Sequence, residues 1–290
     1  MNNVTSWELG LSAADIYSYF YSNQSVLHNQ AVLLSATQTL SDDEHWNLSY
    51  FWDYQSTQEG NNLDLKRDGP GLAISYADVE FKKGDITPTG GGAVKIAHTE
   101  YLEGSEKIAY GKTKLNAQGY TAFWLPKGHA LALLANGVYA PELRYTAIAT
   151  STISARLNSL DQTSHLLRGY PSGVFLGKNM LTANLEYRFP LKSVFRGFQT
   201  WPLFLKDVHA KLFFDTTSLD GIAFEKPEGA SKSQAVNKVF ADEWFSGYGI
   251  ELISDWTMGY YLPISFTIGL HQGIDKETGG DLRVFFGFVL

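Results

Sequence analysis

The feature that most constrains the fold is a strict alternation of apolar and polar residues, which recurs along most of the chain. It is clearest in residues 46–55, 180–189, 261–271 and 281–290. A period of two places successive side chains on opposite faces of a β-strand, and little helical periodicity is present. Further segments of the same kind lie at about 4–14, 30–40, 71–82, 91–102, 106–125, 128–139, 206–217 and 244–255. The sequence therefore predicts an all-β chain with about twelve strands.

The two faces of these segments separate a membrane barrel from a soluble β-sandwich. The segments run for about ten residues, which a tilted strand needs to cross a bilayer and which exceeds the usual globular strand. Polar and charged residues on one face suit a wet lumen and would be costly in a dry core. Aromatic residues cap the apolar faces, as in interfacial girdles: Trp46, Tyr54, Tyr187, Phe189, Trp256, Tyr260 and Tyr261. We predict a transmembrane antiparallel β-barrel, with residues 1–290 as a single domain.

Composition excludes several classes of function. The chain has no cysteine, which removes disulfide and thiolate chemistry. A formal net charge of −7 argues against nucleic acid as a partner, because phosphate binding needs a basic surface. No apolar run is long enough for a transmembrane helix. Met1 opens directly into polar sequence, so we expect the signal peptide of an exported protein to have been removed from this numbering.

The lengths of the connections predict an orientation for the barrel. If the last strand ends in the periplasm, the long connections are external and most short ones are internal. The external ones are 15–29, 56–70, 140–178, 218–243 and 272–279, and the internal ones are 40–45, 126–128 and 256–260. Two inner connections, 83–90 and 190–205, are longer than this scheme expects. An even number of strands with both termini inside is typical of single-chain bacterial outer-membrane barrels.

One region of the sequence resembles a known family. It contains Leu167-Arg168-Gly169-Tyr170, then NLEYRFPL at 184–191, PLFL at 202–205 and LFFD at 212–215. These motifs resemble the C-terminal half of the BamA/TamA-type outer-membrane assembly barrels. The resemblance is specific over about 165–215, diffuse over 216–290 and faint before residue 140.

The resemblance implies a role for a short set of residues. In the family the longest external loop, here about 140–178, folds back into the lumen. Arg168 matches the arginine at its tip, followed by Gly169 and Tyr170. Glu186 and Asp215 match its acidic partners on the next two strands. A guanidinium offers a fork of donors that carboxylates satisfy well, so this set would act as a latch for the loop.

The alternation supports the same set independently of the resemblance. Glu186 shares the polar face of its strand with Thr182 and Asn184, and Asp215 shares a polar face with Lys211. Both carboxylates are therefore expected to face the lumen.

The function implied by the resemblance is assistance in inserting or translocating proteins or lipids at the bacterial outer membrane. It requires no chemical catalysis, cofactor or metal. The expected partners are outer-membrane lipids and unfolded outer-membrane or secreted proteins, and a homodimer is left open. As a hypothesis, the mechanism uses a weak seam between the first and last strands. The seam residues are Gly10, Gly287, Phe288 and Leu290.

The chain departs from the family in three respects. It has fewer strands than most members, lacks a sequence corresponding to the periplasmic POTRA domains, and has Thr216-Thr217 where the family tends to place a glycine. A short branch without POTRA domains is the nearest match.

Two other functions remain open from the residues. A passive small pore or structural barrel would use the same fold, although the lumen charges are mixed in sign. An outer-membrane lipid hydrolase would need a hydroxyl, a histidine and an orienting polar group, for which His98 with Thr99, or His45 beside Trp46, are the candidates. The seven histidines are scattered and no two have a metal-ligand spacing on one strand, so no metal site is predicted.

Overall fold

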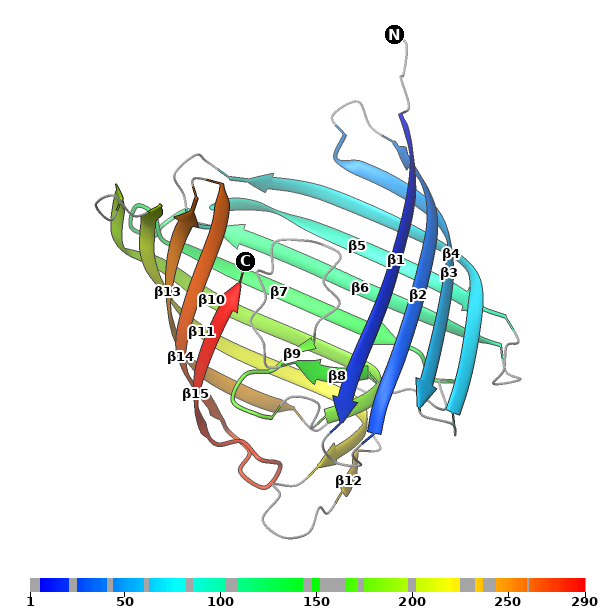
Figure 1. Cartoon of the computed structure of the whole chain (residues 1–290). Helices are drawn as coiled ribbons and strands as arrows, with labels where there is room; N and C mark the ends of the chain where they lie inside the picture. Colours follow the sequence, from blue (N-terminus) through cyan, green and yellow to red (C-terminus); the bar gives the residue numbers. More distant parts are fainter. Residues whose placement is uncertain are drawn as a thin grey trace. The chain divides into compact units, whose positions relative to one another are not determined.

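The computed structural model describes residues 6–20, 25–40, 44–59, 63–81, 86–102, 109–142, 148–151, 165–171, 175–197, 202–224, 233–236, 244–259 and 261–289. All regular secondary structure in these ranges is β-strand (Figure 1). The strands are β1 (Trp7–Phe20), β2 (Ser25–Thr39), β3 (Trp46–Glu59), β4 (Leu63–Glu80), β5 (Gly90–Tyr101), β6 (Tyr110–Thr121), β7 (Ala130–Tyr139), β8 (Ile148–Ser151), β9 (His165–Leu166), β10 (Phe175–Gly197), β11 (Leu203–Phe224), β12 (Ser233–Val236), β13 (Phe245–Met258), β14 (Leu262–Gly273) and β15 (Leu282–Val289). Within the described ranges, no helix is long and apolar enough to span a membrane.

Twelve of these strands follow one another in the sheet in the order of the sequence. The hydrogen-bonded order is β1-β2-β3-β4-β5-β6-β7-β10-β11-β13-β14-β15, and β8, β9 and β12 lie off this path. Each of the twelve coincides with a predicted segment, so the prediction of an all-β, antiparallel fold with about twelve strands is confirmed. The three short strands were not predicted, because two to four residues are too few to show a period of two.

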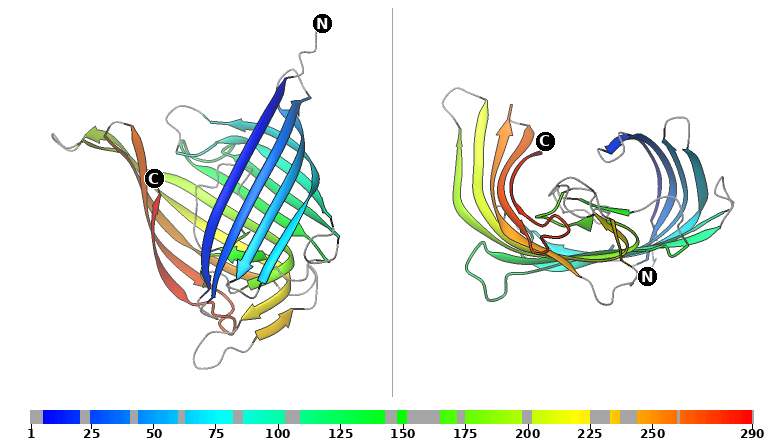
Figure 2. Two further views of the ribbon diagram at one scale, coloured as in Figure 1. Left: turned by 45° about the vertical axis from the view of Figure 1, so that its right-hand side comes forward. Right: turned by 90° about the horizontal axis from the view of Figure 1, so that it is seen from below.

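The described residues group into two compact units. The first contains residues 1–77, 94–115 and 138–143, and the second contains 78–93, 116–137 and 144–290. In the first unit, β1, β2 and β3 run side by side as antiparallel neighbours with an unbroken register (Figures 1 and 2). The prediction of a single domain stays a prediction.

The second unit contains β10, β11, β13, β14 and β15, again as consecutive antiparallel neighbours (Figure 2). The register between β10 and β11 shifts at three points, one of them at Pro190/Lys192. Proline lacks a donor for the ladder and is found in sheets mainly at edges and bulges, so Pro190 explains that shift. The short β8 pairs with β10 and β9 and leads toward the loop segment described below.

The two faces of these strands are inverted relative to a soluble protein. In the second unit one face of the strands carries exposed apolar side chains, and charged side chains on the opposite face are buried. A smaller apolar cluster is also buried: Leu167, Tyr170, Phe175, Met180, Leu219 and Phe245. The exposed set includes Leu185, Leu212, Phe214, Ile250, Leu252, Phe266, Ile268, Leu270, Val284, Phe286 and Phe288. Glu186, Asp215 and Glu251 are by contrast fully buried. An apolar outer face over a polar inner one is the arrangement of transmembrane β-barrel strands.

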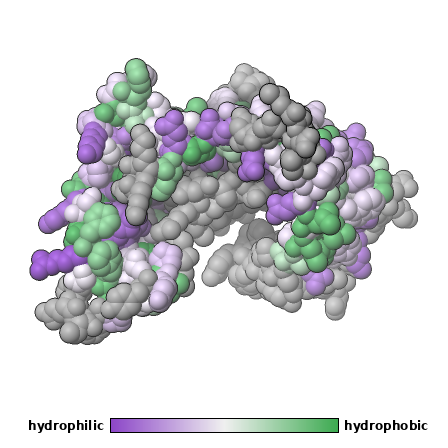
Figure 3. All heavy atoms as spheres, turned by 90° about the horizontal axis from the view of Figure 1, so that it is seen from above, coloured by the Kyte–Doolittle hydropathy of each residue, from purple (hydrophilic) through white to green (hydrophobic). Residues whose placement is uncertain are grey.

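Aromatic residues are also exposed at the turns between strands. Phe123 and Trp124 lie in the turn between β6 and β7, and Tyr261 lies in the turn between β13 and β14. Viewed from above, the described residues show hydrophobic patches separated by hydrophilic residues (Figure 3). Exposed aromatic residues at strand ends are expected at a membrane–water interface.

The strands extend further than the alternation indicated, so several predicted loops are correspondingly shorter, among them 15–29 and 218–243. The connection placed at 190–205 is reduced because β10 continues to Gly197 and β11 begins at Leu203. The loop placed at 56–70 is reduced because β4 begins at Leu63. In the extension of β10 the register against β11 shifts between Ser193 and Arg196, so the alternation is interrupted although the strand continues.

Candidate functional site

The candidate site is formed where a loop segment, residues 165–171, lies against the polar face of the second unit. Asn184 of β10 donates from its side-chain amide to the Leu166 carbonyl over 2.8 Å. The Tyr170 hydroxyl donates to the Ser246 carbonyl over 3.0 Å and accepts from the Asp275 amide over 3.1 Å. Leu166, Leu167 and Tyr170 are all buried. Hydrogen bonds and burial thus fix this segment on β10, β13 and the β14–β15 turn.

Arg168 is fully buried at the centre of the segment and is held by three carboxylates. Its Nε and one terminal nitrogen donate to the two oxygens of Asp215, each over 2.7 Å. The same terminal nitrogen lies 2.9 Å from Glu186, and the other lies 3.5 Å from Glu251. A guanidinium and a carboxylate joined by two parallel hydrogen bonds form one of the stronger polar contacts in proteins. Asp215 also accepts a hydrogen bond from the backbone amide of Arg168 over 3.0 Å, so it holds both the main chain and the side chain of Arg168.

Phe213 completes the surroundings of the guanidinium. The Arg168 guanidinium carbon lies 3.5 Å from the centre of the Phe213 ring, which gives a cation–π contact. Phe213 lies two residues before Asp215 on β11, so both side chains project from one face. Both donor edges and one face of the guanidinium therefore have partners.

Three further side chains contact the carboxylates around Arg168. Lys211 lies 2.8 Å from Glu251 and 3.5 Å from Glu186. Arg188 pairs with the second oxygen of Glu186 over 2.7 Å. His271 lies 2.9 Å from Glu251. Buried charges are tolerated when they are paired, and each of the three carboxylates lies within 2.9 Å of a lysine or arginine side chain.

The charge of Arg168 is secured by the same contacts. Burial opposes the charged form and would lower the pKa of its guanidinium. Asp215, Glu186 and Glu251 outweigh that effect, so the net direction of the Arg168 pKa is upward. The arginine therefore remains a fixed cation at this position.

Two glycines allow the loop to approach the strands closely. Gly169 has a φ of +93°, and a Cβ on it would lie 2.3 Å from the backbone nitrogen of Gly273. A Cβ on Gly247 of β13 would lie 2.0 Å from the Arg168 carbonyl oxygen. Both distances are far below van der Waals contact, so a larger residue at either position would push the segment off the sheet.

The structure brings together the residues that the sequence singled out around Arg168. Gly169, Tyr170, Glu186 and Asp215 all lie in or against the loop segment. The sequence reasoning missed Glu251, which is the third carboxylate. Glu251 could have been found in the sequence, because it is an acidic residue on the polar face of an alternating segment.

The proposed seam residues lie elsewhere. Gly10 is opposite Ser35 in the β1–β2 ladder, and Gly287 and Phe288 are opposite Thr267 and Phe266 in the β14–β15 ladder. Leu290 lies outside the described residues. Since β1 and β15 are the terminal strands of the hydrogen-bonded order, the seam remains a hypothesis about those two strands.

The histidine proposed for a lipid hydrolase has a different neighbour from the one expected. Thr99 is buried, whereas His98 is exposed on the other face of β5. The His98 Nδ1 lies 2.9 Å from the Thr113 hydroxyl of β6, and its Nε2 lies 3.3 Å from Glu100. Adjacent strand residues point to opposite faces, which is why the pairing of His98 with Thr99 is wrong.

Comparison with known proteins places the chain in the class of β-barrel folds. No protein-family model and no curated protein matches the sequence. Among solved structures, the chain is similar to CdiB from Acinetobacter baumannii, with a TM-score of 0.55 and 12% sequence identity. The similarity covers 97% of this chain and 47% of that protein, so the chain spans about half its length. At this level of identity the similarity shows the fold alone.

Proposed function

We propose that the chain is an outer-membrane β-barrel of the BamA/TamA type that assists the insertion or translocation of polypeptides at the bacterial outer membrane. The observation that carries the proposal is the burial of Arg168 between Asp215 and Glu186, the residue set that the sequence resemblance implied. The inverted faces of the strands and the fold shared with CdiB support a membrane barrel. Neither a metal nor an organic cofactor is needed for this function.

The proposed mechanism depends on a rigid second unit. The Arg168 network fixes the loop on β10, β11 and β13, so this wall of the barrel would resist deformation. Opening would then be confined to the seam between β1 and β15, where a lateral gap could disturb the adjacent lipid. In this account Arg168, Glu186 and Asp215 act by holding the loop, and none of them takes part in bond breaking.

An insertion assay tests the proposal. The purified chain is placed in liposomes, an unfolded small outer-membrane barrel is added, and its folding rate is compared with that in empty liposomes. We expect faster folding that Arg168→Ala abolishes and that Arg196→Ala, which changes an exposed arginine of β10, leaves intact. Equal rates with and without the protein would contradict an insertase. Steady ion conductance in those same vesicles would then favour the passive pore.

The hydrolase alternative rests on the order Thr113, His98, Glu100, in which a hydroxyl, an imidazole and a carboxylate follow one another. An imidazole that contacts both groups is the arrangement found in nucleophilic hydrolases. Release of free fatty acid from the same liposomes, abolished by His98→Asn, would support this activity. No release above that of empty liposomes would exclude it.

A further inference from the structure

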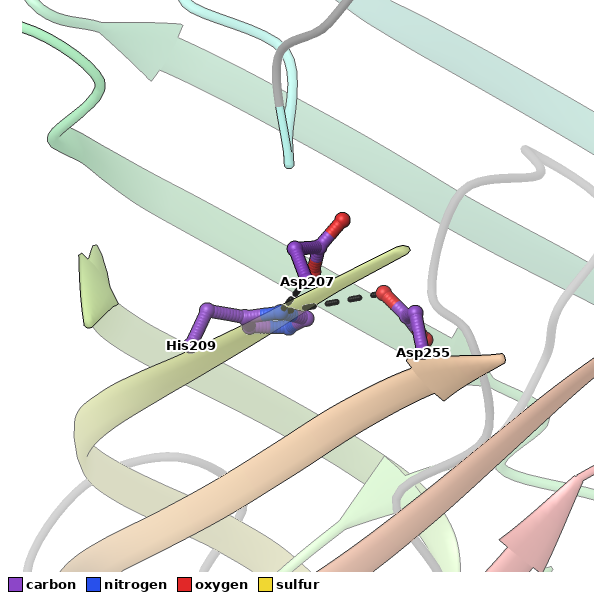
Figure 4. Close-up of side chains that lie close together, drawn as sticks. All are labelled: Asp207, His209 and Asp255. Carbon is purple, nitrogen blue, oxygen red and sulfur yellow. Dashed lines mark hydrogen bonds and ion pairs between the residues drawn. The ribbon is translucent and has the colours of Figure 1, made fainter. Parts of the chain in front are cut away.

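Three metal-ligating side chains converge at a second place on the polar face, away from Arg168. They are Asp207 and His209 of β11 and Asp255 of β13, and the imidazole points between the two carboxylates (Figure 4). The three ligand atoms all lie within 4.8 Å of one another. The His209 Nδ1 is 2.9 Å from one oxygen of Asp207 and 3.7 Å from one oxygen of Asp255. From these contacts we propose that Asp207, His209 and Asp255 bind a divalent transition-metal ion, with zinc as the reference ion.

The strand register explains why these side chains meet. Asp207 and Asp255 are direct partners across the β11–β13 ladder, next to a register shift between Leu205 and Asp207. His209 follows Asp207 by two residues, so it projects from the same face of β11. The convergence is therefore imposed by the backbone of two adjacent strands.

Electrostatics at this point favour a bound cation. Two like charges directly opposite each other in a ladder destabilise a sheet. Asp207 is buried and the Asp255 side chain is only 17% exposed, so water screens their repulsion poorly. The ammonium of Lys206 lies 3.6 Å from Asp207, and the Lys206 side chain is 40% exposed. A divalent ion between the carboxylates would remove the repulsion.

Each carboxylate has one oxygen held from outside the cluster and one directed into it. For Asp207, Oδ2 faces Lys206 and Oδ1 faces His209. For Asp255, the Ser265 hydroxyl donates to Oδ1, and Oδ2 faces His209. Second partners of this kind orient carboxylate ligands toward a metal. The arrangement therefore presents one oxygen from each carboxylate together with the imidazole.

The donor set indicates the kind of ion. Imidazole nitrogen with carboxylate oxygen suits zinc and related transition metals, whereas calcium and magnesium prefer oxygen alone. A tetrahedral zinc ion with bonds of about 2.0–2.2 Å separates its ligand atoms by about 3.3–3.6 Å. The two contacts of His209, 2.9 and 3.7 Å, lie on either side of that range. The three ligand atoms, within 4.8 Å of one another, would move closer together around the ion. Three protein ligands leave further positions for water.

The competing explanation is a protonated His209 that bridges the two aspartates without a metal. Direct metal binding distinguishes the two. The full chain, purified without a histidine tag and refolded in detergent, is stripped with a chelator and titrated with zinc chloride by calorimetry. Cobalt(II) is titrated separately, because its visible absorption reports imidazole and carboxylate coordination. We expect saturable binding of one ion per chain.

Variants identify the ligands. His209→Gln and Asp255→Asn should each weaken zinc binding by at least about 10- to 100-fold, the loss usual for even an outer-shell partner. His98→Gln is the matched control, because His98 also contacts a carboxylate but belongs to no three-ligand group among the described residues. Folding is checked by the heat-dependent gel mobility of each variant. Asp255→Asn keeps the test decisive if His209→Gln does not fold, because Asp255 is the more exposed residue.

Two results would overturn the proposal. One is the absence of saturable zinc binding to the wild-type chain, which would leave the bridging proton as the explanation. The other is equal zinc affinity in the wild type and in folded His209→Gln or Asp255→Asn, which would place the ion elsewhere.

Discussion

Each of the two units contains an arginine that contacts polar side chains. The arginine of the first unit belongs to a strand, whereas that of the second unit belongs to a loop. In the first unit, Arg67 belongs to β4, donates to Gln55 over 3.0 Å and to the Tyr110 hydroxyl over 2.9 Å, and lies above the Tyr101 ring. In the second unit, Arg168 belongs to a loop and is held by carboxylates from three strands.

The difference shows what each arginine does for the fold. Arg67 is fixed by its own strand, so its contacts add to a ladder that exists without them. Arg168 lies outside the strands of the ladder, and its ion pairs add to the hydrogen bonds of Leu166 and Tyr170 in attaching the segment 165–171 to the sheet. The carboxylates of the second unit also depend on Arg168, since Asp215 receives three of its hydrogen bonds from that residue.

The largest effect is expected from Arg168→Ala. It leaves Asp215 buried without the cation that pairs with it and removes one of the three cations around Glu186. Breaking a buried pair from one side typically costs about 3–5 kcal/mol. We expect a folded barrel with a lower urea midpoint and a lower temperature for the shift in gel mobility. Arg196→Ala, on the exposed part of β10, is the control and should change neither measurement. Equal midpoints for wild type and Arg168→Ala would show that the ion pairs do not stabilise the fold.

A smaller effect is expected from Gly169→Ala. The residue has a φ of +93° and no room for a Cβ against Gly273, so strain of about 1–3 kcal/mol is expected. The change keeps every charge, so it separates the fit of the loop from its ion pairs. Gly119→Ala is the matched control, because a Cβ at Gly119 meets nothing within 4 Å. Urea unfolding measures both, and similar midpoints for the two variants would contradict the close approach.

The smallest of the three effects is expected from Arg67→Met in the first unit. The substitution keeps much of the side-chain volume and removes hydrogen bonds to two uncharged groups, which is worth about 1–2 kcal/mol. Urea unfolding should show a shift clearly smaller than that of Arg168→Ala. A shift in the urea midpoint of Arg67→Met as large as that of Arg168→Ala would contradict the difference between the arginine on a strand and the arginine in a loop.

Much of the fold could be predicted because a period of two is visible in a single sequence. The positions of twelve strands followed from it, as did the direction of Glu186 and Asp215. The strand ends could not be predicted, since a register shift such as that between Ser193 and Arg196 interrupts the alternation before β10 ends. Backbone hydrogen bonds continue there without leaving a pattern in the side chains.

The site could be predicted only in part, because its geometry depends on register. The resemblance and the alternation pointed to Arg168, Glu186 and Asp215. The contribution of Glu251 and the meeting of Asp207 with Asp255 depend on which residues of β11 and β13 lie opposite each other. A single sequence specifies the face of each residue but not its partner on the next strand.

The central claim, that Arg168 holds the loop segment on the sheet, is tested most directly by hydrogen exchange of the backbone amides from Leu166 to Tyr170. The wild type and Arg168→Ala are compared in the same detergent, with the amides of β13 as an internal reference. We predict that exchange in the segment becomes much faster in the variant while β13 stays protected. Unchanged protection of the segment in a folded Arg168→Ala chain would contradict the claim.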